Sequence, residues 1–323
     1  MAVRCGALSL GAQGNSYLEK GDWQASLGYR WLHSDRHFRG GTEEANRQAN
    51  DTEVINDVHT FDLSVAHAFS SRFSLALTLP FVHADRSSKY EHLGNNPPTN
   101  PRFSTQAGGL GDVRLVGTYW LFNPEKHPNG NFAFGLGIKA PTGEYEATDI
   151  FHKRRNGVEV LERGFVDNSI QPGDGGWGIM FEAQGFQKVF ENTFAYMNAT
   201  YLANPRERVP STGYSVWDAY VLRAGLTYAL WPSKGLAVSL GGRLEGVPVE
   251  DWFGGSEGSR RPGYAISIEP GITWTHRKFT VNVTAPVALE RNREKSVSDL
   301  RNNRHGDAAF ADYLITSSIS YRF

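Results

Sequence analysis

Residues 312–323, DYLITSSISYRF, alternate between apolar and polar side chains. The apolar phase holds Tyr313, Ile315, Ile319, Tyr321 and Phe323. Only Leu314 and Ser317 break the alternation. Because successive side chains of a β-strand point to opposite faces, this stretch predicts a strand whose two faces meet different solvents.

The same alternation recurs along the chain, and it predicts about twelve strands in all. The other candidates are residues 23–31, 60–69, 73–81, 112–121, 132–138, 177–183, 193–202, 220–228, 236–245, 264–274 and 279–287. Residues 193–202 do not reveal which phase is apolar. An even number of strands places both ends of the sheet on the same side.

The connections between these strands are alternately short and long. Residues 70–72 and 276–278 are short turns, whereas residues 85–109 and 141–175 are long polar loops. Soluble sheets also alternate, but they do not require aromatic residues at strand ends around the whole sheet. The pattern predicts an all-β, up-and-down antiparallel transmembrane barrel with short periplasmic turns and long extracellular loops. We therefore expect a bacterial outer-membrane location.

Composition agrees with this class and excludes others. Mean hydropathy is -0.43 and hydrophobic residues are 40% of the chain, and no stretch approaches the roughly 20 apolar residues of a spanning helix. A barrel shows a lower average because only every second residue meets lipid. The net charge of -1 argues against a nucleic-acid partner. Cys5 stands alone, so an intrachain disulfide and cysteine-based metal motifs are excluded.

The chain divides into two expected parts. Residues 1–21 form a periplasmic leader or a segment inside the lumen, and residues 22–323 form the barrel. Residues 1–14 lack the basic and long apolar regions of a signal peptide. We expect a mature chain from which the export signal has been removed; the alternative is a cytosolic protein that never carried one.

Three prolines interrupt the predicted strands. Pro80, Pro270 and Pro286 lie within apolar alternating runs, and proline cannot donate a hydrogen bond to a β-ladder. We expect these residues to mark bulges or the points at which strands leave the bilayer.

Charged residues fall in the phase opposite to the lipid face, which predicts a polar lumen. The candidates that line it are Arg30, Asp62, Asp112, Arg114, Lys139, Glu182, Arg223, Arg243, Glu245 and Glu269. Arg or Lys facing lipid at mid-bilayer would cost roughly 2–4 kcal/mol. Two interpretations remain open: a polar conduit that attracts solutes, or acids and bases that pair and fill the lumen.

Motifs for chemistry are scarce. The sequence contains no HExxH, and no His-x-Ser pair lies along a predicted strand. His33, His59, His67 and His83 fall near strand ends, where imidazoles are usually interfacial, and residues 173–176 read as a turn. We expect no catalytic residue, no metal and no cofactor. Basic loop residues predict an outer rim that contacts lipopolysaccharide phosphates or is simply solvated: Lys153, Arg154, Arg155, Arg291, Arg293 and Arg301.

Two stretches carry a resemblance. The ending Tyr321-Arg322-Phe323 resembles the assembly signal that the barrel-insertion machinery reads, with Tyr321 and Phe323 as its aromatic positions. Residues 108–114 (GGLGDVR) and 135–145 (GLGIKAPTGEY) resemble outer-membrane transporters grouped with the meta-pathway of phenol degradation. There, a Gly-Leu-Gly-Asp strand start and a Lys/Arg-x-Pro-Thr-Gly strand end recur. The resemblance implies uptake of small hydrophobic or aromatic compounds.

Three functions follow as hypotheses. The first is a barrel that passes a small solute without chemistry, in contact with outer-membrane lipid and lipopolysaccharide. The second is a structural or partner-binding barrel plugged by its loops, residues 141–175 above all. The third, a membrane-embedded hydrolase, lacks a nucleophile–base pair in the sequence.

Overall fold

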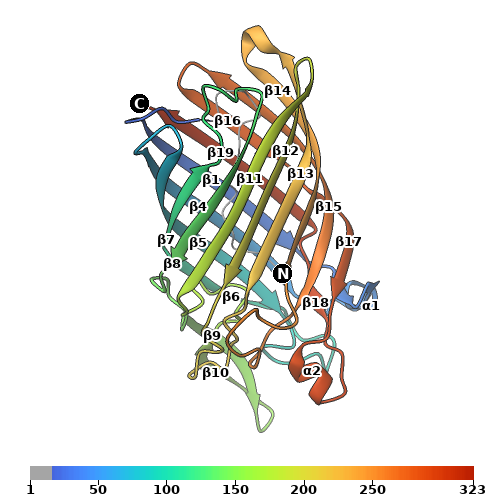
Figure 1. The fold of residues 1–323 in the computed structure, drawn as a ribbon. Helices are drawn as coiled ribbons and strands as arrows, with labels where there is room; N and C mark the ends of the chain where they lie inside the picture. The colour runs from blue at the N-terminus through green and yellow to red at the C-terminus, as the bar shows by residue number, and fades with distance from the viewer. Residues whose placement is uncertain (1–16) are drawn as a thin grey trace.

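A computed structural model describes residues 17–323, and in this part of the chain twelve antiparallel strands close into a barrel (Figure 1). Ten of them are continuous: β1 (Trp23–Ser34), β4 (Ile55–Ala68), β5 (Phe73–Ser88), β8 (Gly130–Lys139), β11 (Gly178–Phe190), β12 (Thr193–Ala203), β13 (Ala219–Trp231), β14 (Leu236–Val247), β15 (Gly263–His276) and β19 (Tyr313–Arg322). The other two are interrupted: β6 (Phe103–Leu110) with β7 (Arg114–Trp120), and β16 (Phe279–Thr284) with β17 (Val287–Arg293). Pairing of β19 with β1 and of β14 with β15 closes the sheet.

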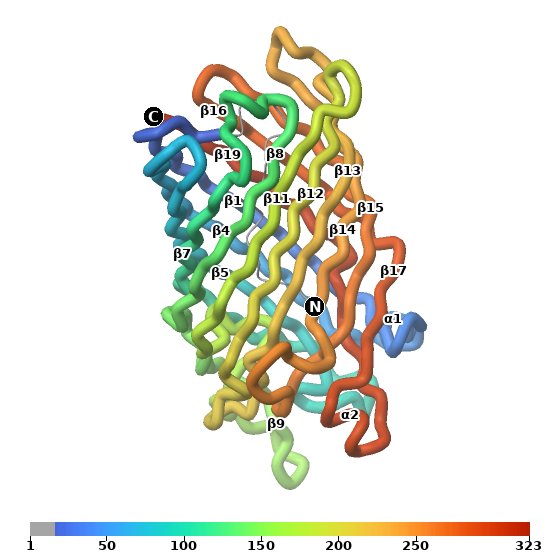
Figure 2. The backbone as a smooth tube through the Cα atoms, in the orientation of Figure 1, coloured from blue at the N-terminus to red at the C-terminus, as the bar shows by residue number. Residues whose placement is uncertain are grey.

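The short turns and the long loops lie at opposite ends of the barrel, as predicted. The backbone N–H of Trp23 donates to the carbonyl of Phe323 at 3.0 Å, so the first and last strands meet at the short-turn end (Figures 1 and 2). The long-loop end carries α1 (Asn46–Ala49), α2 (Val297–Arg301), the hairpin of β9 (Thr148–Arg155) and β10 (Val158–Phe165), and a small sheet of β2 (His37–Arg39), β3 (Thr42–Glu43) and β18 (Ala308–Ala309).

Large apolar side chains cover the outside of the sheet. Hydrogen-bonded register places Val281, Ile319, Leu27, Leu63 and Leu79 side by side on five neighbouring strands. Exposure reaches 62% for Leu136 and 56% for Leu240. In water such a continuous belt would be strongly unfavourable, so its solvent is lipid.

Aromatic side chains gather at both ends of this belt. Trp23, Phe69 and Phe73 lie near the short turns, and Trp31 stacks with Tyr313 at a centroid distance of 6.5 Å toward the long loops. Such girdles mark the two membrane–water interfaces of transmembrane barrels. No helix among residues 17–323 has the length and apolar character needed to span a membrane.

The strands extend further toward the long-loop end than predicted. The expected loop at residues 85–109 contains the end of β5 and all of β6, and the expected loop at residues 141–175 contains β9 and β10. These extensions leave the lipid, so their outward residues no longer need to be apolar and the alternation fades. Hydropathy alone therefore underestimates the strand lengths.

The three prolines occupy two kinds of position. Pro80 and Pro270 lie inside continuous strands, while Pro286 lies in the break between β16 and β17. The carbonyl of Pro80 accepts from Gly111 at 2.7 Å, and that of Pro270 accepts from Ala285 at 3.1 Å. Each acceptor residue therefore faces an interrupted strand. Because the N–H and C=O of one strand residue point to the same edge, the missing N–H of each proline also faces the interruption.

We predict that Leu63→Arg on the outer face of β4 lowers the free energy of unfolding in lipid bilayers by about 2–4 kcal/mol, because a cation then faces acyl chains. Denaturant titration in liposomes measures the change. Leu161 is also exposed, but it lies on the β9–β10 hairpin beyond the barrel. Leu161→Arg is the control and should change the free energy by less than about 0.5 kcal/mol; equal costs would contradict a lipid-facing belt.

Candidate functional site

The charged residues predicted for the lumen are all buried or half-buried, and most form ion pairs. On one wall, Glu269 lies 2.7 Å from Arg223 and 3.6 Å from Arg243, and it accepts a hydrogen bond from Thr284 at 3.0 Å. Arg243 also lies 2.7 Å from Glu245. These groups come from β13, β14, β15 and β16, so they link neighbouring strands.

Four further predicted residues lie on other strands of the barrel. Arg114 on β7 lies 2.7 Å from Asp62 on β4, and Arg30 on β1 interacts electrostatically with Glu245. Glu182 on β11 makes no hydrogen bond or ion pair with another residue in the range 17–323; its nearest charged influence is Arg114.

A segment of the longest loop crosses the lumen, and we call residues 166–174 the crossing segment. Val166 and Ile170 are fully buried against Val82, Ala84 and Ala107 of β5 and β6. From the same segment, Asn168 donates to the carbonyl of Ser259, in the loop that precedes β15, at 3.0 Å. The segment thus links β5 and β6 to the loop before β15, and β15 is not adjacent to these strands in the sheet.

The crossing segment is anchored by the two stretches that carry the family resemblance. Asp112 accepts hydrogen bonds from the backbone N–H groups of Gly143 and Asp174, both at 3.0 Å. Lys139 lies 3.7 Å from the Asp112 carboxylate and pairs closely with Asp174. The two motifs and the end of the crossing segment therefore form one unit, which we call the anchor.

Glycines make the anchor possible. A Cβ on Gly143 would lie 2.8 Å from the Cα of Gly173 and the carbonyl carbon of Gly111. A Cβ on Gly173 would lie 2.6 Å from the carbonyl oxygen of Gly143. Only residues without a side chain allow these three backbones to approach so closely.

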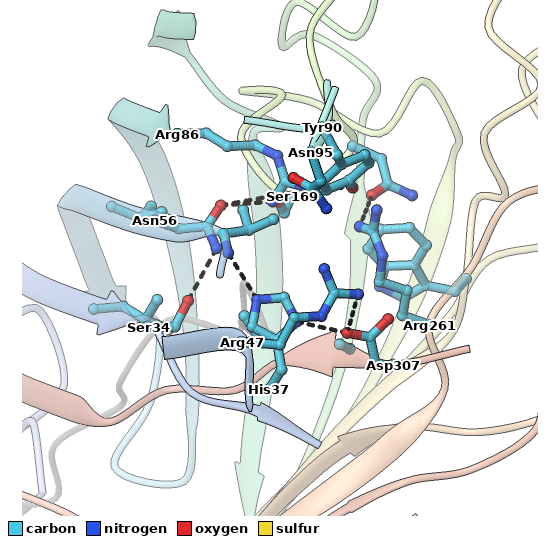
Figure 3. Close-up of a pocket in the computed structure, with 17 residues that line it drawn as sticks. Ser34, His37, Arg47, Asn56, Arg86, Tyr90, Asn95, Ser169, Arg261 and Asp307 are labelled. Atoms are coloured by element: carbon cyan, nitrogen blue, oxygen red, sulfur yellow. Dashed lines mark hydrogen bonds and ion pairs between the residues drawn. The ribbon is translucent and has the colours of Figure 1, made fainter. Parts of the chain in front are cut away.

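A cavity of about 380 Å³ lies on the long-loop side of the crossing segment (Figure 3). We call it the outer cavity. Leu32, Val54, Val58 and Trp217 give it an apolar surface. Figure 3 shows Asn56 and Ser169 near Arg86, with Arg261 further to the right.

The arginines of the outer cavity are held by carboxylates from the loops. Arg261 donates to both oxygens of Asp167, at 2.8 and 2.7 Å, and Arg86 lies 3.7 Å from the same carboxylate. Burial works to raise the pKa of Asp167, but the charges of Arg261 and Arg86 outweigh it and hold that pKa well below its usual range. Asp167 is therefore a fixed negative charge on the crossing segment.

A second group of charged residues lines another side of the outer cavity. Asp307 lies 2.7 Å from Arg47 and 2.9 Å from Nδ1 of His37. Because the backbone N–H of Val54 donates to Nε2 of His37 at 2.8 Å, the Nδ1 of that ring carries the proton that goes to Asp307. Burial works to raise the pKa of Asp307, but the His37 hydrogen bond and the Arg47 charge hold it well below its usual range.

A smaller cavity of about 60 Å³ lies deeper in the barrel, and we call it the inner cavity. It shares Leu32, Val58 and Ser169 with the outer cavity. Its other walls include Arg30, Asp112, Arg114 and Lys139 from the predicted lumen set. It has room for a few water molecules only, and Ser169, Pro172 and Asp174 of the crossing segment form part of its lining.

The remaining predicted residues have identifiable partners. His33 lies 2.9 Å from Asp57, His59 lies 2.9 Å from the Tyr29 hydroxyl and stacks on His83, and His67 packs against Trp23. No cluster of three potential metal ligands occurs within residues 17–323. At the short-turn end, the ring of Tyr321 lies between those of Phe279 and Phe323.

The predicted basic rim is paired within the chain. Arg155 lies 2.8 Å from Glu162, Arg293 lies 2.8 Å from Asp299, and Arg291 lies 3.5 Å from Asp312. Lys153 donates to the carbonyl of Glu91, and Arg301 pairs with Glu257. Arg154 donates to Asn100 at 3.3 Å. A lipopolysaccharide phosphate would have to compete with these partners.

Sequence reasoning missed the residues of the outer cavity. Arg86 was assigned to a loop although it belongs to β5, and Asp167 and Arg261 were not singled out. Nothing in the local pattern joins them, because Asp167 and Arg261 are 94 residues apart. The local signal for Asp167 is an acidic residue directly after an apolar one, Val166, in a long loop.

The closed barrel, its apolar exterior and its charged interior define an outer-membrane β-barrel protein. A sequence model of the family described as the MetA pathway of phenol degradation matches residues 34–153, which confirms the resemblance drawn from the two motifs. No curated protein matches the sequence.

Three solved structures are similar to this chain at low sequence identity. An outer-membrane channel from Pseudomonas putida F1 is 12% identical, with a TM-score of 0.60 over 95% of this chain and 97% of that chain. The translocator domain of the autotransporter NalP from Neisseria meningitidis is 11% identical, with a TM-score of 0.48 over 95% of this chain and 90% of that chain. The P. putida toluene transporter TodX is 10% identical, with a TM-score of 0.45 over 94% of this chain and 90% of that chain.

We predict that Glu269→Gln destabilises the folded barrel by about 3–5 kcal/mol, because two buried guanidinium groups lose their shared carboxylate. Denaturant titration in lipid measures the free energy. Glu182→Gln is the matched control and should cost less than about 1 kcal/mol, since Glu182 has no such partner. A similarly small loss of stability for both variants would show that the charge of Glu269 does not stabilise the barrel.

We also predict that Gly143→Val raises single-channel conductance, because the new side chain clashes with Gly111 and Gly173 and displaces the crossing segment from its anchor. Planar-bilayer recording measures the conductance. Gly242→Val is the control, since a Cβ on Gly242 meets no atom within 4 Å. An unchanged conductance in a folded Gly143→Val protein would show that the anchor does not restrict the lumen.

Proposed function

We propose that this protein is a passive channel of the outer membrane that takes up a small, largely apolar solute. The outer cavity carries this proposal: it lies on the long-loop side of the barrel, combines an apolar surface with a polar wall, and leads toward a charged passage. Ligand sites typically have this mixture of apolar lining and a few oriented polar groups.

The cargo follows from the cavity and from the comparisons together. An aromatic ring fits against Leu32, Val58 and Trp217, while hydroxyl groups can bond to Asn56 or Ser169. The matching family is linked by its description to phenol degradation, and the P. putida F1 protein is described as a channel. The family description supports an aromatic solute, and the likeness to the P. putida F1 protein supports a channel.

The crossing segment favours one alternative, a barrel plugged by its own loop. It lines both cavities, since Ser169 borders both and Pro172 and Asp174 border the inner one, so it stands along the route between them. A channel therefore requires this segment to move, whereas a structural or partner-binding barrel requires it to stay. A membrane-embedded hydrolase needs a nucleophile and a base in contact; we expect none here, and a screen against ester and phospholipid substrates tests that view.

Four assignments remain proposals of the same kind. We propose that residues 22–323 form the barrel, with residues 17–21 leading into it; the expected leader otherwise lies outside the described residues. We propose that the ten charged residues named above line the solute path. We propose that Tyr321 and Phe323 are read by the barrel-insertion machinery, and that the basic rim meets lipopolysaccharide.

Liposome swelling tests the channel. We predict that proteoliposomes swell in iso-osmotic benzyl alcohol or phenol faster than protein-free liposomes do, and that Gly143→Val increases the protein-dependent rate. The rate in a large sugar such as sucrose should remain at the protein-free level. If neither the wild type nor Gly143→Val conducts any small solute, the channel proposal is wrong and the structural or partner-binding barrel takes its place.

A further inference from the structure

The two arginines of the outer cavity differ in where their acidic partners lie. Arg86 is 4% exposed and keeps Glu91 as a partner at 2.6 Å, whichever way the crossing segment lies. Among residues 17–323, the ion-pair partner of Arg261 is Asp167, and its other hydrogen-bond partner is the adjacent Asn168. Both partners of Arg261 therefore belong to the segment that blocks the lumen.

The geometry at Arg261 is that of carboxylate recognition. Its two terminal nitrogens each donate to one oxygen of Asp167, at 2.8 and 2.7 Å. A planar guanidinium matches a carboxylate in this paired arrangement, whereas a hydroxyl or an amide satisfies only one of the two bonds. Asp167 occupies the position that a ligand carboxylate would take.

Opening the passage separates this pair. The crossing segment lines both cavities, with Ser169 bordering both and Pro172 and Asp174 bordering the inner one. We therefore expect a solute that passes inward to displace this segment together with Asp167. The Arg261 charge then loses its paired carboxylate beside an apolar surface and keeps the charge of Glu91 as a longer-range influence. A neutral solute does not compensate that loss, while a solute with one carboxylate replaces the one charge that leaves.

We propose that the outer cavity binds a small solute bearing a single carboxylate, which takes the place of Asp167 between Arg261 and Arg86 as the crossing segment moves. This proposal rests on the transport function proposed above and narrows its substrate to hydrophobic monocarboxylates. The hydrocarbon part lies against Leu32, Val54, Val58 and Trp217. The loop carboxylate acts as an internal competitor that keeps the passage closed in the absence of solute.

Binding of benzoate and of its neutral analogue benzamide tests the proposal. Titration calorimetry on the detergent-solubilised protein should show benzoate binding about tenfold more tightly or better, the advantage expected of a charge-assisted paired contact. Arg261→Gln should remove most of this preference while leaving benzamide unchanged. Asp167→Asn should strengthen benzoate binding and leave benzamide unchanged, because the competitor is gone.

The control is Arg155→Gln, which breaks an exposed Arg–Glu pair on the β9–β10 hairpin and should leave both affinities unchanged. Equal affinity for benzoate and benzamide in the wild type would overturn the proposal. So would an Asp167→Asn protein that gains affinity for both compounds alike, which would mean that the segment merely obstructs.

Swelling assays separate this proposal from the transport function. A faster protein-dependent entry of benzoate than of benzamide, measured against protein-free liposomes, supports both proposals. Equal entry leaves transport standing and rejects the carboxylate preference. Selective benzoate binding without flux of either compound supports the carboxylate site and rejects the channel.

Discussion

The structure depends on one constraint: a backbone N–H or C=O group in the bilayer core has no water to pair with and must find a partner within the protein. A sheet meets this requirement only when it closes, as β14 and β15 close this one. The same constraint limits where proline is tolerated. Pro80 and Pro270 each direct their missing donor toward an interrupted strand, so the unpaired position falls where the ladder already ends.

One of these interruptions builds the candidate site. Residues 111–113 leave the ladder between β6 and β7, which frees the Asp112 side chain to accept two backbone N–H groups from the loop after β8. Lys139, at the end of β8, neutralises the carboxylates gathered there. The break opposite Pro80 and the inward path of the crossing segment are thus parts of one arrangement.

The contrast between the lipid-facing and the lumen-facing side of each strand explains what could be predicted from sequence. Lipid on one side and charge on the other impose a two-residue period, so the strands between Trp23 and Phe323 were recognisable, and Asp112 and Lys139 were found through their motifs. The ends of β5 and the β9–β10 hairpin lie beyond the lipid and lose that period. Arg86, Asp167 and Arg261 meet only through the folding of a long loop, and no local pattern records a contact between residues 94 positions apart.

The two interpretations of the lumen charges, structural pairing and a conduit, apply to different residues. Arg223, Arg243, Glu245 and Glu269 all lie on barrel strands, so the hydrogen-bonded ladder fixes their separations and they cannot part without opening the sheet. In contrast, Asp167 is a loop residue that pairs with Arg86 of β5 and with Arg261 of the loop before β15. Such a pair can separate while every strand stays paired, which is a requirement for any gate in a closed barrel. Charges that join strand to strand stabilise the barrel, and charges on the crossing segment are those a solute can exchange.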